Sequence, residues 1–297
     1  MKQFIICLLL FAANLLKAQE QPCLPIVLPQ LTEETKKLYE QKVQEIKSKL
    51  IKDSANAEHI IWYGRRTGYT GQYMEAIDIY TKGISLHPTN ARFYRHRGHR
   101  YITVRCFDKA IADLTRATML FKDQVDEIEE DGLPNAKNIP TSTLQTNTWY
   151  HLGLAYFLKG DYKNALSAFN ECLEITDNDD MYVATVNWLF ITMRRFGKNK
   201  EADDLLKNIR ANMDLTENQD YLDILLMYKN NDDKKVAEKK MTPDSPGNAT
   251  LGFGLGNYYL EKGQKKKAKE IFEKVVAGSQ WASFGFIAAE VELKRMK

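Results

Sequence analysis

The sequence predicts an all-α protein in which repeated pairs of antiparallel helices stack into a superhelix. The prediction depends on a set of residues that recurs at fixed offsets along the chain. The five anchor positions of the repeat are Gly64, Gly98, Gly153, Phe190 and Gly256. A small residue follows each anchor twelve positions later, at Ala76, Ala110, Ala165, Ala202 and Ala268. A large apolar residue follows sixteen positions later, at Tyr80, Leu114, Phe169, Leu206 and Phe272.

A third column marks the turn inside each pair, seven residues after the anchor. Four of the five copies have glycine there, at Gly71, Gly160, Gly197 and Gly263, and Arg105 is the exception. Small anchors and alanines allow two helix backbones to approach at the short end of the usual ~8–10 Å range. Since one such pair cannot bury its own apolar face, three or more pairs must stack.

These columns resemble the tetratricopeptide repeat (TPR) family, whose 34-residue pattern combines an aromatic residue, Leu-Gly, Tyr, Ala, Phe and Pro. The third copy matches best, through Trp149, Leu152, Gly153, Tyr156, Ala165 and Phe169. The first copy supplies Pro88, whereas the second departs at Arg97 and the fourth has Phe190 in place of glycine. The resemblance implies a right-handed superhelix, or solenoid, whose inner surface binds peptides or partner segments.

The N-terminus has the features of a signal peptide over residues 1–19: Lys2, an apolar run from Phe4 to Leu16, and small residues near Ala18. The apolar run is shorter than the ~20 residues that cross a bilayer. We therefore expect an exported protein, periplasmic or secreted, from a Gram-negative bacterium. The residues before Cys23 do not resemble a lipoprotein cleavage box.

Residues 20–56 are expected to contain a flexible Pro-rich stretch and one helix ahead of the array. Thr32 can cap this helix, whose apolar residues are Leu38, Val43, Ile46 and Leu50. The array itself is predicted over 57–280, and a capping helix over 281–297. The predicted units lie near 57–90, 91–122, 146–178, 183–215, 216–242 and 249–280. The fifth is degenerate, with helices around Leu222 to Tyr228 and Lys234 to Lys240.

An insertion is predicted at 123–145, because the second and third anchors are 55 residues apart. Apolar spacing predicts that the second helix of unit two continues into it, to about Glu130. The residues that keep this spacing are Ile111, Leu114, Thr118, Phe121, Val125 and Ile128. Gly132, Pro134 and Pro140 then end the helix.

Charge and cysteine content narrow the class of protein. Removing residues 1–19 removes Lys2 and Lys17 and no acid, so the formal charge falls from +3 to +1. A dedicated nucleic-acid-binding protein would be strongly basic, so no nucleic-acid partner is expected. Three cysteines remain, Cys23, Cys106 and Cys172, without zinc-site spacing. The sequence leaves open whether Cys23 or Cys106 forms a disulfide, and Cys172 is predicted to be buried.

No catalytic, cofactor-binding or metal-binding motif is recognisable, so we expect a protein that is not an enzyme and has no cofactor. His96 and His99 have a spacing that metal sites use, but four arginines surround them. The glycines of residues 251–256 follow no predicted strand, which excludes a dinucleotide-binding loop.

The candidate partner-binding groove is built on the basic stretch at 91–100. Arg92, Arg95 and His99 share one helix face, and Arg65 occupies in unit one the place of His99. Arg97 and Arg100 are expected to point elsewhere. With Tyr69 and Tyr150, they would form an anion-binding wall for an acidic segment, since arginine offers bidentate hydrogen bonds. The carboxylate clamp of one TPR subclass is not reproduced, because Ile61 and Arg65 stand where its first Lys and Asn would be. Alternatively, the arginines pair with the acidic run at 123–131, folded over the groove entrance.

The predicted function is a non-enzymatic scaffold or assembly factor of the cell envelope that binds a protein or peptide. A second interpretation is a glycan-binding protein or glycan-active enzyme whose aromatic groove is formed by Tyr69, Tyr150, Tyr156 and Trp149. The absence of a carboxylate pair near these residues favours the scaffold. The partner, the pathway and the oligomeric state do not follow from the sequence.

Overall fold

The computed structural model describes residues 22–130, 132–133, 135–239 and 246–297. These residues form fourteen α-helices and no β-strand. The helices are α1 (Glu33–Lys52), α2 (Ala57–Tyr69), α3 (Tyr73–Leu86), α4 (Ala91–Thr103), α5 (Phe107–Phe121), α6 (Leu144–Lys159), α7 (Tyr162–Glu174), α8 (Asp179–Arg195), α9 (Asn199–Leu206), α10 (Gln219–Asn230), α11 (Lys234–Glu238), α12 (Pro246–Glu261), α13 (Lys265–Val276) and α14 (Phe284–Arg295). The predicted signal peptide lies outside the described residues.

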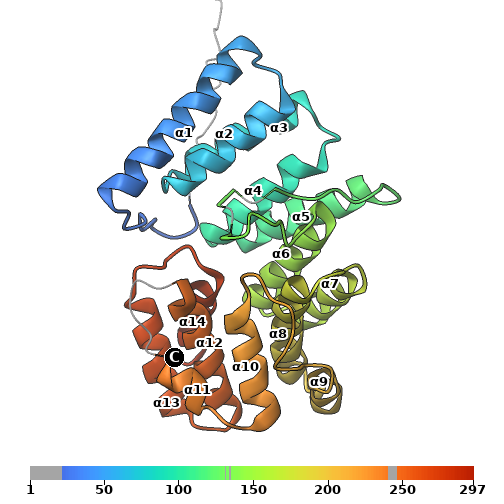
Figure 1. Cartoon of the computed structure of the whole chain (residues 1–297), viewed down its shortest axis with the longest axis vertical. Helices are drawn as coiled ribbons and strands as arrows, with labels where there is room; N and C mark the ends of the chain where they lie inside the picture. The colour runs from blue at the N-terminus through green and yellow to red at the C-terminus, as the bar shows by residue number, and fades with distance from the viewer. Residues whose placement is uncertain (1–21, 131, 134, 240–245) are drawn as a thin grey trace, which may run out of the picture.

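The helices are arranged as successive antiparallel pairs that stack along the chain. Each helix from α1 to α10 packs against the next, and α12 continues the stack against α10 (Figure 1). The predicted all-α array of helical pairs is therefore confirmed. The degenerate pair corresponds to α10 and the short α11, in the stretch where the sequence predicts two helices.

The turn column marks a position where the backbone takes a left-handed conformation. Its φ angles are 88° at Gly71, 90° at Gly160, 82° at Gly197 and 74° at Gly263. Arg105, the exception in the column, has the same conformation, with φ of 62°. Since a side chain is disfavoured there by about 1–3 kcal/mol, the contacts of Arg105 must offset that cost.

The anchor column marks the closest approach of the two helices of a pair. A Cβ atom added to Gly153 would lie 2.5 Å from the Phe169 ring, and one added to Gly256 would lie 2.4 Å from the Phe272 ring. In both copies the residue sixteen positions later thus packs directly on the anchor. Glycine is required here because a methyl group would displace a buried ring.

Replacing Ala165 by Leu is expected to lower the free energy of unfolding by roughly 1–3 kcal/mol, since extra methylene groups would be forced into a filled core. Ala165 is fully buried. Equilibrium denaturation measures the change. Lys266→Ala on the exposed side of α13 is the control and should change stability by less than about 0.5 kcal/mol. An unchanged Ala165→Leu protein would contradict the assigned column.

The predicted extension of the second helix of unit two to about Glu130 is wrong. Helix α5 ends at Phe121, and Asp123 takes a left-handed φ of 63° that no helix can continue through. Val125 is 97% exposed and Ile128 is 72% exposed, so their three-four spacing does not reflect a buried helix face.

Contacts with the start of α6 hold the insertion in an extended form instead. The backbone N–H of Glu129 donates to the Ser142 carbonyl at 3.1 Å, and that of Leu144 donates to the Glu127 carbonyl at 2.9 Å. The Asp126 carboxylate accepts a hydrogen bond from the Gln145 N–H at 3.1 Å. Tertiary hydrogen bonds have therefore replaced the local helical ones.

The Pro-rich stretch ahead of α1, predicted to be flexible, is fixed to the array over residues 22–31. Cys23 forms a disulfide with Cys106, and its N–H donates to the Val104 carbonyl at 3.2 Å. Ile26 packs on the main core, and Pro29 covers Gly71. The Pro-rich composition suggested flexibility, and it gives no sign of the disulfide because the partner cysteine is 83 residues away in sequence.

The C-terminal helix α14 packs on α12 and α13, as a capping helix would, but it also contacts α6 (Figure 1). Arg105 joins this end to the middle of the chain. Its guanidinium forms an ion pair with Glu290 at 3.0 Å, donates to the Trp281 carbonyl at 2.9 Å and stacks on the Trp281 ring at 3.7 Å. Arg105, with its left-handed backbone conformation, thus fastens the C-terminal end to the concave side of the array.

No described helix combines the length and the apolar character that crossing a bilayer demands.

Candidate partner-binding pocket

A pocket of ≈370 Å³ lies on the concave side of the array. The first helices α2, α4, α6 and α8 supply one side of it. The insertion, the loop before α10, and single residues of α3, α10 and α14, namely Tyr80, Tyr221 and Phe284, supply the rest. Pockets of ~300–1,000 Å³ commonly hold small ligands. Of the sequence-predicted groove residues, the structure gathers Arg65, Tyr69, Arg95, His99 and Tyr150 around this pocket, but not Arg92.

Arg95 is neutralised inside the protein. Its Nε atom lies 3.0 Å from Oε2 of Glu129, and the two side chains are only 7% and 6% exposed. Asn147 also donates to Glu129, at 3.3 Å. Arg92 lies outside the pocket, where it pairs with Glu58 and approaches Glu127 at 3.9 Å. The acidic run of the insertion therefore pairs with Arg95, as the alternative interpretation of the sequence predicted, but it only approaches Arg92, whose close partner is Glu58.

Two other arginines of the pocket have no carboxylate partner in the part of the chain that the structure describes. Arg65 donates to the backbone carbonyl of Glu130 at 2.6 Å and stacks on Trp62 at 4.3 Å. Arg100, which the sequence predicted to point away from the groove, lines the pocket instead and donates to Nε2 of His99 at 2.9 Å. Both side chains are half-buried, so the basic wall of the pocket, defined here as Arg65 and Arg100, carries two positive charges that no described carboxylate contacts in an ion pair.

The three histidines of the pocket are neutral. Burial, followed by the charge of Arg95, lowers the pKa of His96 and of His151 well below the usual histidine value. Burial, followed by the charge of Arg100, does the same to the pKa of His99. Protonation would place further positive charge beside buried arginines, which is unfavourable.

Hydrogen bonds to fixed partners assign the histidine tautomers. A guanidinium can only donate, so Nε2 of His99 accepts from Arg100 and its Nδ1 carries the proton. Nδ1 of His151 contacts the Asn147 carbonyl and must donate to it, which leaves Nε2 as an acceptor. The two rings lie 4.4 Å apart. Together they offer one donor and one acceptor.

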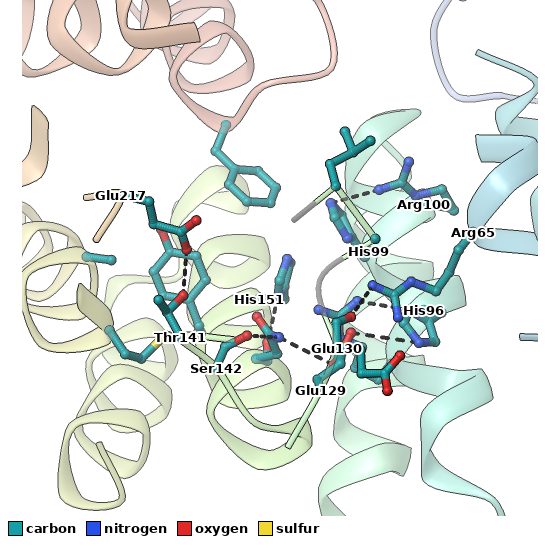
Figure 2. A pocket seen from close by; sticks show the side chains of 18 of the residues that line it. Arg65, His96, His99, Arg100, Glu129, Glu130, Thr141, Ser142, His151 and Glu217 are labelled. Carbon is teal, nitrogen blue, oxygen red and sulfur yellow. Dashed lines mark hydrogen bonds and ion pairs between the residues drawn. The ribbon is translucent and has the colours of Figure 1, made fainter. Parts of the chain in front are cut away.

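The opposite wall of the pocket carries Glu217, which the sequence analysis missed. Its carboxylate accepts from the Thr141 hydroxyl at 2.5 Å, and no cation pairs with it among the described residues. Asp180, at the start of α8, fixes the loop by accepting from the backbone N–H groups of Thr216, Glu217 and Asn218 at 2.7–2.9 Å. Figure 2 shows Glu217 and Thr141 on one side of the pocket, Arg65 and Arg100 on the other, and His151 between them.

The aromatic residues of the second interpretation are divided between two places. Tyr69 and Tyr150 line the pocket, and Tyr150 hydrogen-bonds Tyr221 hydroxyl to hydroxyl at 3.1 Å. Tyr156 packs against the core, and Trp149 packs on Phe121 with ring centroids 6.4 Å apart. The four residues therefore do not form one aromatic groove.

The remaining chemical candidates do not assemble a site. In the described ranges, no group of three or more His, Cys, Asp or Glu side chains is placed to hold a metal ion. Cys172 is buried in the core, where burial raises the pKa of its thiol to about 11. A thiol with such a pKa is unreactive at neutral pH.

The stacked helical pairs and the concave pocket define a helical-repeat binding protein. Residues 146–179 and residues 253–277 each match a tetratricopeptide repeat family model. The chain therefore contains tetratricopeptide repeats, as the columns of its sequence predicted.

Individual relatives are distant. A heat-shock protein cognate co-chaperone, sgt12 of Aspergillus fumigatus, is 27% identical over 107 residues, which span 36% of this chain and 25% of that protein. Among solved structures, YrrB, described as a TPR protein with an unusual peptide-binding site, is 15% identical with a TM-score of 0.45, over 84% of this chain and 98% of YrrB. The APC/C hetero-tetramer Cut9–Hcn1 is 16% identical with a TM-score of 0.49, over 87% of this chain and 40% of the matched one.

Proposed function

We propose that this protein is an exported, non-catalytic scaffold that binds a partner protein and takes an acidic group of that partner into the concave pocket. Tetratricopeptide repeat proteins bind proteins or peptides, and the pocket lies on the face formed by the first helices of the pairs. The observation that carries the acidic character is the basic wall, since Arg65 and Arg100 lack carboxylate partners.

Recognition is assigned to these two arginines instead of Arg92 and Arg95. Glu58 and Glu127 already pair with Arg92, and Glu129 pairs with Arg95. Removing Glu129 from Arg95 would leave a buried charge unpaired. A guanidinium that is bound only to neutral groups can still form two parallel hydrogen bonds with an incoming carboxylate.

Export is supported by the disulfide between Cys23 and Cys106. Disulfides persist in oxidising compartments such as the bacterial periplasm or the exterior, and they are rare where thiols are kept reduced. A bond that encloses α1 to α4 therefore suits the compartment that a signal peptide implies.

The absence of catalysis is supported by the placement of the carboxylates. Hydrolysis of a glycan requires two carboxyl groups, one of them with a raised pKa. Burial of its side chain raises the pKa of Glu261 to about 7, but Glu261 lines a different cavity that has no second carboxylate. In the concave pocket, Glu129 is committed to Arg95.

The test is capture of the partner from an envelope extract by wild-type protein and by a double variant, Arg65→Gln with Arg100→Gln, with identification by mass spectrometry. Capture of the same protein should fall by about tenfold or more in the variant, because each lost charge-assisted hydrogen bond is worth more than ~1 kcal/mol. Wild-type capture should also weaken as salt increases.

Arg116→Gln is the matched control, because Arg116 is exposed on α5 and away from the pocket. It should capture as the wild type does. Equal capture by a double variant that melts like wild type would refute the role of the basic wall. Capture that no variant changes would place the partner on another surface.

A further inference from the structure

We propose that the concave pocket binds a small zwitterion, either a free amino acid or a peptide of two or three residues with both termini free. Its carboxylate would lie at the basic wall and its ammonium group at Glu217. The proposal rests on the proposed function only in placing binding in the same pocket, and it adds the chemistry of the group that binds.

The first observation is that charges of opposite sign face the same cavity without pairing. Glu217 forms no ion pair with a cation, and neither Arg65 nor Arg100 forms one with a carboxylate, within the described residues. All three side chains line the pocket, where Arg65 and Arg100 are half-buried and Glu217 is exposed. A ligand with charges of opposite sign at its two ends can pair with all three side chains, and its carboxylate gains most at the half-buried arginines.

The second observation is that neutral hydrogen-bonding groups lie between the charged walls. His99 offers a donor at Nδ1 and His151 an acceptor at Nε2, from rings 4.4 Å apart. A peptide group has one N–H donor and one carbonyl acceptor, so it matches this pair. His96 adds a buried Nε2 atom without a hydrogen-bond partner in the pocket wall.

The third observation is the size of the pocket. At ≈370 Å³ it lies near the lower end of the ~300–1,000 Å³ range of ligand sites. The insertion closes one side through Glu129 and Ser142, and Phe284 closes another, with its ring 5.3 Å from that of His151. A ligand of one to three residues is of the size that such a space can hold.

Charge also distinguishes this ligand from a phosphate. Three glutamates, Glu129, Glu130 and Glu217, line the same pocket as the arginines. A dianion would meet their repulsion, whereas a zwitterion makes use of Glu217. The same argument disfavours a ligand with two carboxylates and no amine.

The first experiment is a thermal-shift screen of the full protein with each of the twenty standard amino acids and with sets of dipeptides and tripeptides at millimolar concentration. A ligand that binds only the folded state raises the melting temperature in proportion to its affinity. At least one compound with free termini should do so. A screen in which no compound raises the melting temperature would overturn the proposal.

The second experiment uses the best compound together with its N-acetyl and C-amide forms and inorganic phosphate, measured by isothermal titration. Each blocked form should bind about tenfold more weakly than the free compound, the equivalent of ~1.4 kcal/mol. Phosphate should not bind in the same range. Equal binding of the blocked forms, or binding of phosphate alone, would overturn the zwitterion.

Two variants assign the two ends. Glu217→Gln should weaken binding of the free compound but leave binding of the N-acetyl form unchanged. Arg100→Gln should weaken binding of the free compound but leave binding of the C-amide form unchanged. Glu217→Asp, which retains the charge, should recover part of the affinity, and melting without ligand checks the fold. If partner capture depends on Arg65 and Arg100 while Glu217→Gln and the free compounds have no effect, the proposed function survives and the zwitterion does not. If the compounds bind as expected but never compete with the partner, the zwitterion site survives and the proposed partner binding in this pocket does not.

Discussion

Replacing Glu129 by Gln is expected to lower the free energy of unfolding by about 3–5 kcal/mol, because it leaves the buried guanidinium of Arg95 without its counter-charge. The two side chains are 6% and 7% exposed, so water cannot replace the lost partner. Urea or guanidinium denaturation measures the change, and the insertion should become more accessible to proteolysis.

The matched control removes both charges together, as Arg95→Met with Glu129→Leu. This double variant should lose much less stability than the single one, since apolar residues of similar size often replace a buried ion pair at little cost. A Glu129→Gln protein as stable as wild type would mean that the insertion does not stay on the concave face in solution.

Replacing Cys23 by Ser is expected to destabilise the protein by about 2–5 kcal/mol, since the disulfide closes a long loop and so restricts the unfolded chain. The bonded residues are 83 positions apart. Denaturant unfolding with and without a reducing agent measures the effect. Amide exchange should also rise around Arg105, whose turn is held by Cys106 on one side and by Glu290 on the other.

A comparison of wild type with Cys23→Ser separates the effect of losing the disulfide from the effect of replacing the side chain. The reducing agent should destabilise wild type to the level of Cys23→Ser and should leave Cys23→Ser itself unchanged. Cys172 does not confuse the readout, because it is free and buried. If reduction leaves the stability of wild type unaltered, the bond does not form in the protein and the support for export is lost.

Much of the candidate site followed from the sequence, because the repeat fixes which residues face inward. Arg65, His99 and Tyr150 sit on first helices, and each lines the concave pocket as the TPR resemblance implies. Arg92 shares a helix face with Arg95 but lies one turn nearer the helix start, where Glu58 reaches it. Helical periodicity gives the direction of a side chain but not the partner that meets it.

Glu217 could not be found in this way. It lies in a loop between two pairs, outside every column, and its position depends on hydrogen bonds from the loop backbone to Asp180, 37 residues earlier in the case of Glu217 itself. A loop residue without a recurring spacing carries no signal in a single sequence. Its relation to the arginines exists only once the array has folded.

The sequence by itself determined the helical pairs, since close backbone approach at Gly153 and a left-handed turn at Gly160 are local requirements that residue type alone must meet. Only the tertiary structure decided how the concave side is filled. The insertion lies across it because Glu129 pairs with Arg95, and the C-terminal end closes it because Arg105 reaches Trp281, 176 residues away. The physical reason is that local sterics act between neighbours in the chain, whereas charge pairing and aromatic stacking act between any groups that the fold brings together.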